Sequence, residues 1–285
     1  MPVPLGPAEL IALSGTDALS FAHAQFTSDV RALAAGRWQW SAWLDAQGRV
    51  RHFFALLHVE PSTVIAWLPL GGADTMRIAL SRFVVRAKVD IQARVWALSA
   101  LSDADMPVPP APDAVIAHDG GWAFLQPGPG QRIAAIAPSA IPAPDRAALE
   151  RWRMDDIAAG LPLLVPELAG EFVAQALDLE RFDAIGFDKG CYPGQEVVAR
   201  LHFRGGNKRY IQRLCVCGAA PAGGSEILDA AGDPIGRVLY AAASSAATTS
   251  AALAILTRTI DANTALYTAD GAQAALAGRD VGTDS

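Results

Sequence analysis

The chain has 285 residues, of which 52% are hydrophobic, so it can form two ordinary domains or one elaborated fold. Its net charge of −6 excludes a general electrostatic attraction to nucleic acid or to an anionic membrane. The longest apolar runs, such as residues 53–57, are too short to cross a bilayer. Residues 1–4 lack the charged and apolar regions of a signal peptide, and three cysteines cannot pair completely. We therefore expect a cytoplasmic protein with free thiols and no membrane partner.

Strands and helices alternate in the first hundred residues, which predicts an α+β arrangement. Thr16 is expected to cap a helix that carries Asp17 in its first turn and ends near Phe26. A second helix should bury a face made of Met76, Ala79, Leu80, Phe83 and Val84. The expected strands are 10–13, 37–44, 50–58, 63–68 and 89–93, with a tight turn at 45–48.

Residues 102–112 are rich in Pro, Ala and Asp and form the first plausible linker. Two short strands are expected beyond it, at 122–125 and 133–136. Asp145 can cap a helix that places Leu149, Trp152 and Ile157 broadly on one side. Gly160 suits the position just past the end of that helix.

Short apolar segments separated by glycine turns follow Tyr210, at 211–216, 226–228, 234–240, 251–259 and 265–268. This pattern predicts a small β-barrel or sandwich.

The stretch 189–200 has the most reactive composition of the chain, because it places a thiol, an ammonium, a carboxylate and a guanidinium around Pro193 and Gly194. Proline followed by glycine suits the central positions of a type II turn, which would display Cys191 at a bend. Lys189 and a helix starting near Gly194 could lower the pKa of the Cys191 thiol. A small buried side chain is an equally weighted alternative for Cys191.

Two further groups near this stretch each have a functional and a structural interpretation. Glu196 could bind ligand donors, but an ion pair with Arg200 four residues later is the favoured interpretation. A run without acids extends from Val197 to Arg213 and could bind a polyglutamate tail, a phosphate or RNA. Its cations could equally protect a strand edge. The basic residues of the run are Arg200, His202, Arg204, Lys208, Arg209 and Arg213.

Metal binding is not predicted. Cys215 and Cys217 should share one face of a strand and could join Cys191 in a thiolate site, but two small core residues are the favoured interpretation. The five histidines show no ligand spacing. The chain also lacks a P-loop, a dinucleotide fingerprint and a Gly-x-Ser-x-Gly elbow.

The residues Lys-Gly-Cys-Tyr-Pro-Gly-Gln-Glu at 189–196, followed by Ala-Arg at 199–200, resemble the signature of the YgfZ family of folate-binding iron–sulfur maturation proteins. This family is related to the T-protein (aminomethyltransferase) of glycine cleavage. Flanking segments agree in the same order along most of the chain, at 25–30, 44–49, 159–162, 172–175 and 203–209.

The resemblance implies a T-protein-like folate-binding fold of two interleaved α+β domains plus a C-terminal β-barrel. On this chain the folate-binding region would cover 1–208, with an approximate break near 102–112, and the barrel would cover 209–285. Tetrahydrofolate, or a derivative of it, would lie in the central opening.

The resemblance also implies roles for individual residues. Cys191 would be the functional thiol, assisted by Lys189. Trp152 would contact folate, and a core residue of its helix is an equally weighted interpretation. The remaining cofactor-binding residues would be Tyr192, Gln195, Glu196 and Arg200.

The function that follows is a tetrahydrofolate-binding accessory factor for the assembly or repair of iron–sulfur proteins, which affects iron–sulfur-dependent tRNA modification. Its partners would be iron–sulfur client proteins or cluster carriers, with an anionic tail or RNA at Arg204, Lys208 and Arg209. A folate-dependent aminomethyltransferase, with Asp45 as its carboxylate, and a folate-binding scaffold without catalysis are the alternatives.

Overall fold

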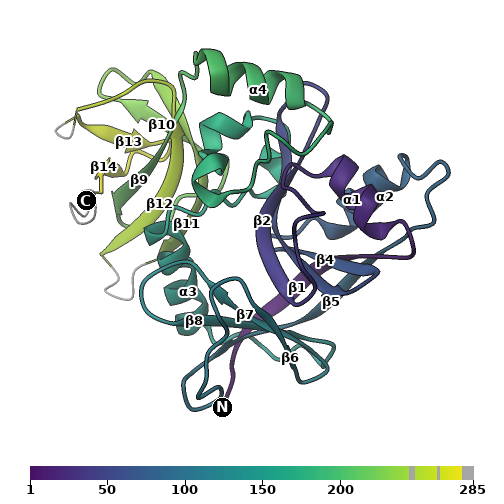
Figure 1. Cartoon of the computed structure of the whole chain (residues 1–285). Helices are drawn as coiled ribbons and strands as arrows, with labels where there is room; N and C mark the ends of the chain where they lie inside the picture. Colours follow the sequence, from purple (N-terminus) through teal and green to yellow (C-terminus); the bar gives the residue numbers. More distant parts are fainter. Residues whose placement is uncertain (244–247, 262–263, 278–285) are drawn as a thin grey trace.

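The computed structural model describes residues 1–243, 248–261 and 264–277. The fold is α+β, with an eight-stranded antiparallel sheet and a closed six-stranded barrel (Figure 1). The strands of the sheet follow the order β2-β3-β4-β1-β5-β8-β7-β6, so the sheet continues across residues 102–112. The predicted barrel covers 209–285, and its residues 278–285 lie outside the described residues.

The strands of the sheet agree with the sequence where their apolar pattern is regular, as in β2 and β4, but β1 and β5 are longer than predicted. Pro4, Gly6 and Pro7 belong to β1, where the register against β5 shifts between Pro4 and Gly6. Such an irregularity accommodates residues that a regular ladder excludes. The strands are β1 (Val3–Ser14), β2 (Arg37–Leu44), β3 (Val50–Glu60), β4 (Thr63–Leu68), β5 (Asp90–Leu101), β6 (Val115–His118), β7 (Gly121–Gln126) and β8 (Arg132–Ala137).

Helices α1 (Ala18–Gln25) and α2 (Ala73–Ser81) cover one face of the sheet around a core that includes Phe26 and Phe54. Two details of the prediction are wrong. Helix α1 begins at Ala18, and Asp17 precedes it and accepts the backbone N–H of Lys88 at 2.7 Å instead of lying in the first turn. Helix α2 ends at Ser81, because the chain turns there, so Phe83 and Val84 lie beyond it.

Helix α3 (Arg146–Ala158) lies against the opposite face of the sheet. The Asp145 carboxylate accepts the backbone N–H of Ala148 at 2.9 Å, which confirms the predicted cap. Gly160 has the left-handed φ of +66° expected past the helix end. Three short 3-10 helices, η1 (Pro166–Leu168), η2 (Ala174–Leu177) and η3 (Leu179–Phe182), then lead to α4 (Gln195–Arg204).

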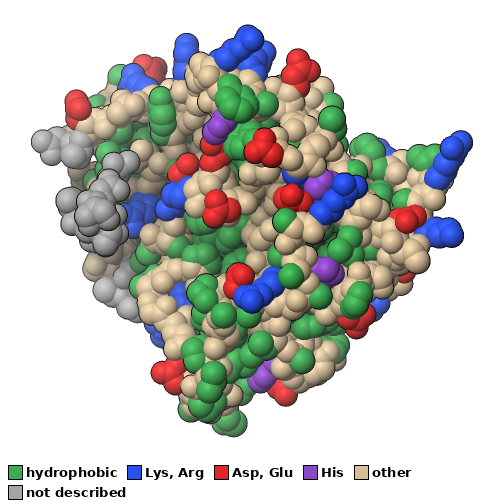
Figure 2. All heavy atoms as spheres, viewed as in Figure 1, with side chains coloured by type: hydrophobic (Ala, Val, Ile, Leu, Met, Phe, Trp, Pro, Cys, Tyr) green, Lys and Arg blue, Asp and Glu red, His purple; other side chains and the backbone are tan. Residues whose placement is uncertain are grey.

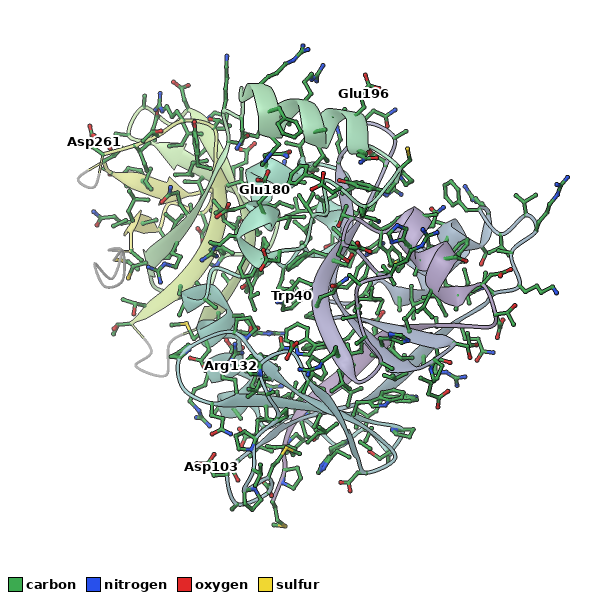
Figure 3. All side chains as sticks on the ribbon, in the orientation of Figure 1. Trp40, Asp103, Arg132, Glu180, Glu196 and Asp261 are labelled. Carbon is green, nitrogen blue, oxygen red and sulfur yellow. The ribbon has the colours of Figure 1, made fainter. Side chains whose placement is uncertain are left out.

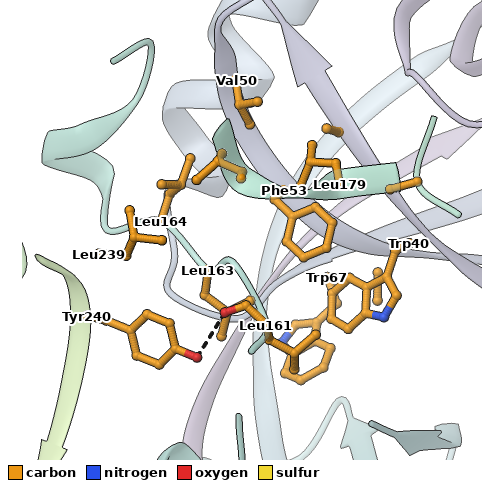
Figure 4. Close-up of a cluster of buried hydrophobic side chains, with 14 of the residues drawn as sticks. Trp40, Val50, Phe53, Trp67, Leu161, Leu163, Leu164, Leu179, Leu239 and Tyr240 are labelled. Carbon is orange, nitrogen blue, oxygen red and sulfur yellow. Dashed lines mark hydrogen bonds between the residues drawn. The ribbon is translucent and has the colours of Figure 1, made fainter. Parts of the chain in front are cut away.

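The predicted barrel is present and packs its outer side against the rest of the protein. Inward residues such as Leu214 and Val216 form a core of their own, whereas Tyr240 and Leu253 belong to the main core. The Tyr240 hydroxyl donates to the Leu161 carbonyl at 3.0 Å, as Figure 4 shows. The barrel strands are β9 (Tyr210–Cys217), β10 (Glu226–Asp229), β11 (Pro234–Ala243), β12 (Thr249–Leu256), β13 (Leu266–Thr268) and β14 (Gln273–Leu276).

Among the described residues, no helix combines the length and the apolar character that a membrane span requires.

Candidate functional site

The turn at Pro193 and Gly194 has the predicted geometry. Gly194 has φ +78° and ψ 0°, and the Gln195 N–H donates to the Tyr192 carbonyl at 3.2 Å, as in a type II turn. A β-carbon on Gly194 would lie 2.5 Å from the Asp45 carbonyl oxygen and 2.6 Å from the α-carbon of Gly48. Only glycine therefore allows this turn to dock on the turn between β2 and β3.

Cys191 precedes this turn and is exposed. The buried alternative considered for this thiol is wrong, because the turn carries it to the surface. Helix α4 begins four residues later, at Gln195. The thiol is therefore accessible to a partner at the end of the molecule where α4 starts.

Lys189 lies directly before this segment but points into the protein, with only 7% of its surface exposed. Its ammonium donates to the carbonyls of His23 and Phe26 at the C-terminal end of α1. Burial lowers the pKa of the Lys189 ammonium to about 8, although Asp29 acts in the opposite direction. Lys189 thus ties the motif to the negative end of a helix dipole.

His23 completes this attachment from the opposite direction. Its Nε2 lies 2.6 Å from the Lys189 carbonyl, which can only accept, so this nitrogen carries the proton. The Nδ1 atom lies 3.3 Å from an Asp29 carboxylate oxygen. Both the backbone and the side chain of Lys189 are therefore held by α1 and the residues next to it.

Tyr192 is buried beneath the motif, and the Lys189 ammonium lies 4.9 Å from its ring centroid. Its hydroxyl has no hydrogen-bond partner among the described residues. Burial raises the pKa of the Tyr192 phenol, and the negative charge of Glu180 raises it further. Tyr192 therefore buries a neutral hydroxyl that has no partner among the described residues.

The other predicted residues of this motif lie on α4. Gln195 is half-buried, and Glu196 and Arg200 are exposed. The favoured ion pair between Glu196 and Arg200 is wrong, because it is absent from the ion pairs of the described chain. Both charges are therefore available to a ligand or to solvent.

Trp152 lies apart from the Cys191 segment, on α3. Its ring is 9% exposed, and the Arg132 guanidinium covers one face at 4.2 Å from the ring centroid. Arg132 also donates to Asp156 at 2.7 Å and to the Trp152 carbonyl at 2.9 Å. These contacts fix the orientation of the Trp152 ring.

A cavity of about 380 Å³ lies beside Trp152, with Trp67 and Asp156 also in its lining. The described lining contains no residue of 189–200, so the predicted site residues fall into two groups. In Figure 3, Glu196 at the start of α4 and Arg132 near α3 lie well apart. Cys191 and Trp152 therefore do not line the same cavity.

Sequence reasoning missed the Arg132–Asp156 pair. Burial raises the pKa of the Asp156 carboxyl, and the Arg132 charge opposes this effect. Ala148, Trp152 and Asp156 follow at intervals of four residues, and all three are buried. An acid in the buried stripe of a helix was the signal that could have revealed this pair.

Cys215 and Cys217 lie on one face of β9, as predicted, but this face is exposed. Their interpretation as core residues is wrong, because Leu214 and Val216 point into the barrel instead. The described residues contain no group of three His, Cys, Asp or Glu side chains that could hold a metal ion.

Comparison with a solved structure identifies the fold. The crystal structure of the glycine cleavage system aminomethyltransferase T from Bartonella henselae superposes with a TM-score of 0.64, at 16% identity, over 96% of this chain and 83% of that one. The chain thus has the T-protein-like fold that its motif predicted.

Comparison with curated sequences then defines the family. The tRNA-modifying protein YgfZ of Serratia proteamaculans is 30% identical over 226 residues, which cover 72% of this chain and 68% of the relative. The YgfZ protein of Sodalis glossinidius is 28% identical over 239 residues, which cover 76% and 72%. A scan against models of known protein families gives no match. The chain belongs to the YgfZ family, as the motif at 189–200 indicated.

Proposed function

We propose that this protein is a tetrahydrofolate-binding accessory factor for the assembly or repair of iron–sulfur proteins, and that it thereby affects tRNA modification. The observation that carries the proposal is the exposed thiol of Cys191, displayed by a type II turn in a chain of the YgfZ family. Its partners would be iron–sulfur client proteins or cluster carriers, in the cytoplasm.

Cys191 would act as a thiolate toward a cluster, a cluster sulfur or a one-carbon adduct of folate. An exposed thiol can reach such a partner without rearrangement of the core. Lys189 would support this role by holding the segment in place through its bonds to α1. A role in the maturation of iron–sulfur proteins is favoured over one-carbon transfer, because the reactive group that the motif exposes is the Cys191 thiol.

The residues around Trp152 suit the pterin of tetrahydrofolate, which would bring one-carbon chemistry to the protein. The cavity has about the volume of a small ligand, and its lining is largely apolar. Arg132 covers one face of Trp152, so a pterin would have to stack on the other face. An oxygen of Asp156 could accept hydrogen bonds from pterin N–H groups. Tyr192, Gln195, Glu196 and Arg200 lie outside this cavity, and their binding role would concern the distal part of the folate or a partner at α4.

The test of the thiol is complementation. Cys191→Ala, in cells that lack the native gene, should fail to restore the activities of iron–sulfur enzymes. Cys215→Ala is the matched control, because it removes another exposed thiol. Full rescue by Cys191→Ala would eliminate the thiol mechanism.

The test of folate binding is a titration with tetrahydrofolate, followed by tryptophan fluorescence. The wild type should show quenching that Trp152→Phe largely removes and Trp122→Phe retains. Lys189→Ala is titrated in the same way. A weaker affinity for tetrahydrofolate would indicate that Lys189 contacts folate, and an unchanged affinity would indicate that it only holds the motif in place. A wild type that shows no saturable change would refute the folate part of the proposal.

The two alternatives have discriminating assays. An aminomethyltransferase would form methylenetetrahydrofolate from an aminomethyl-lipoyl carrier, yet the Asp45 carboxylate accepts N–H bonds from Gln47 and Arg49 at 3.0 and 2.9 Å. These bonds explain Asp45 as a turn residue without catalysis. A scaffold would bind folate and support cells equally well after Cys191→Ala.

A further inference from the structure

The outer side of α4 and the segment after it form a basic and aromatic surface, of which only Arg200 has a role in the proposed function. We call it the α4 surface and define it by Arg200, Phe203, Arg204, Lys208, Arg209 and Tyr210, all of which are exposed. The spacing of Arg200, Phe203 and Arg204 places them on one side of the helix. Figure 2 shows Lys and Arg side chains gathered over α4 at the top of the view, next to hydrophobic and histidine side chains.

An aromatic cluster stands at the centre of this surface. Phe203 is 75% exposed and meets the His202 ring edge-on at 4.8 Å. His202 stacks on Phe187 at 3.9 Å, and its Nδ1 lies 2.8 Å from a Glu180 carboxylate oxygen. Phe187 and Glu180 thus hold His202 in place, while the Phe203 ring is exposed to solvent.

The cations around Phe203 are not neutralised. Within the described chain, Arg200, Arg204 and Lys208 form no ion pair with a carboxylate. Arg209 contacts the Glu171 carbonyl and the Phe172 ring, neither of which cancels its charge. A protein with a net charge of −6 therefore concentrates unpaired positive charge on one side.

We propose that the α4 surface binds single-stranded RNA, with Phe203 stacked on an unpaired base and Arg204, Lys208 and Arg209 on the phosphates. Aromatic faces flanked by cations are the usual means of holding unpaired nucleotides. A membrane is a poorer fit, because Phe203 is a single apolar side chain among cations on the outer side of α4. The inference rests on the proposed role in tRNA modification.

The geometry also relates this surface to Cys191. Helix α4 starts directly after the motif turn, and Phe203 lies eight residues beyond Gln195, or about 12 Å along the helix axis. A loop of RNA held at Phe203 would therefore extend within reach of the Cys191 end of the helix.

The experiment measures fluorescence anisotropy of a labelled RNA hairpin with an unpaired loop, and of a blunt RNA duplex, at low and near-physiological salt. Phe203→Ala should weaken hairpin binding about 10-fold and leave duplex binding unchanged. Arg204→Gln with Lys208→Gln should weaken both and lower the salt dependence by about two counterions. Arg82→Gln with Arg86→Gln, in the exposed segment just after α2, is the matched control and should bind as the wild type does. Circular dichroism confirms that each variant is folded.

Three results would overturn the inference. They are a wild type that binds no RNA at low salt, hairpin affinity that Phe203→Ala leaves unchanged, and a control that weakens binding as much as the α4 variants. Binding to vesicles of anionic lipid that Phe203→Ala abolishes, without an effect on RNA, would assign the surface to a membrane instead. The assay contains no folate and does not use Cys191, so its failure is distinguishable from failure of the folate titration or of Cys191 complementation.

Discussion

Cys191 owes its exposure to two residues that follow it. Pro193 and Gly194 impose a type II turn, and the turn leaves Cys191 on the surface while Tyr192 turns inward. Lys189 turns inward as well, to the carbonyls of α1. Lys189 and Tyr192 thus attach the motif to the protein, whereas Cys191 is displayed at the surface.

All three thiols should react in the native protein, because Cys191, Cys215 and Cys217 are exposed. Titration with a chromogenic disulfide reagent is expected to count three thiols per chain without denaturant and two in Cys191→Ala. Further thiols that appear only in urea would contradict the structure.

Lys189→Met should destabilise the protein by about 1–3 kcal/mol at neutral pH, because two buried carbonyls lose a charged donor. The pKa of Lys189 is about 8 when folded and 10.5 in its unperturbed state, so between these values the unfolded chain binds more protons. The contribution of Lys189 to the free energy of unfolding of the wild type therefore rises with pH between about 8 and 10.5. The deficit of Lys189→Met, measured by urea unfolding, should grow from pH 8 to pH 10.5.

Lys208→Met is the control for this experiment, since Lys208 is exposed. It should match the wild type across the same pH range. A Lys189→Met deficit that shrinks as pH rises would show that the amine is not buried as described.

At the scale of elements, the motif is positioned by contact between two turns. The turn at 45–48 and the turn at 192–195 meet through glycines, with no room for a β-carbon on Gly194. Regular strands and a capped helix form locally, but the contact between these turns exists only after β2, β3 and α4 are in place. Gly194 is therefore both a turn residue and the point where two segments distant in the sequence are in contact.

Gly194→Ala should cost about 3 kcal/mol or more, because it combines a left-handed backbone with a clash against backbone atoms. Gly190→Ala is the matched comparison, with φ +92° and open space around its β-carbon, and should cost about 1–2 kcal/mol. Urea unfolding of the two variants measures the difference. Equal costs would mean that the turns are not in close contact.

At the scale of the whole molecule, one core joins the sheet, α3 and the outer side of the barrel. Leu239 and Tyr240 of the barrel belong to the same buried cluster as Trp40 and Trp67 of the sheet (Figure 4). Leu253 of the barrel is also a member of this cluster. The barrel thus shares its core with the sheet and α3 and should unfold with them.

Leu253→Ala is expected to lower stability by about 2–5 kcal/mol, since this side chain is 1% exposed. The seven tryptophans lie between residues 38 and 152, outside the barrel. Their fluorescence should nevertheless report the same drop in Tm as far-ultraviolet circular dichroism. A fluorescence Tm that stays at the wild-type value would show that the barrel unfolds independently.

The sequence by itself determined the family, the α+β class, the barrel, the Asp145 cap and the type II turn before α4. Each of these depends on local chemistry, such as a proline that fixes φ, a glycine that tolerates positive φ, or a side chain that caps a helix. The tertiary structure alone decided that Lys189 binds α1, that Trp152 and Cys191 stand apart, and that Cys215 and Cys217 face outward. These facts depend on which segments meet in space, because a side chain takes its role from its neighbours, and those of Lys189 at His23 are 166 residues away in the chain.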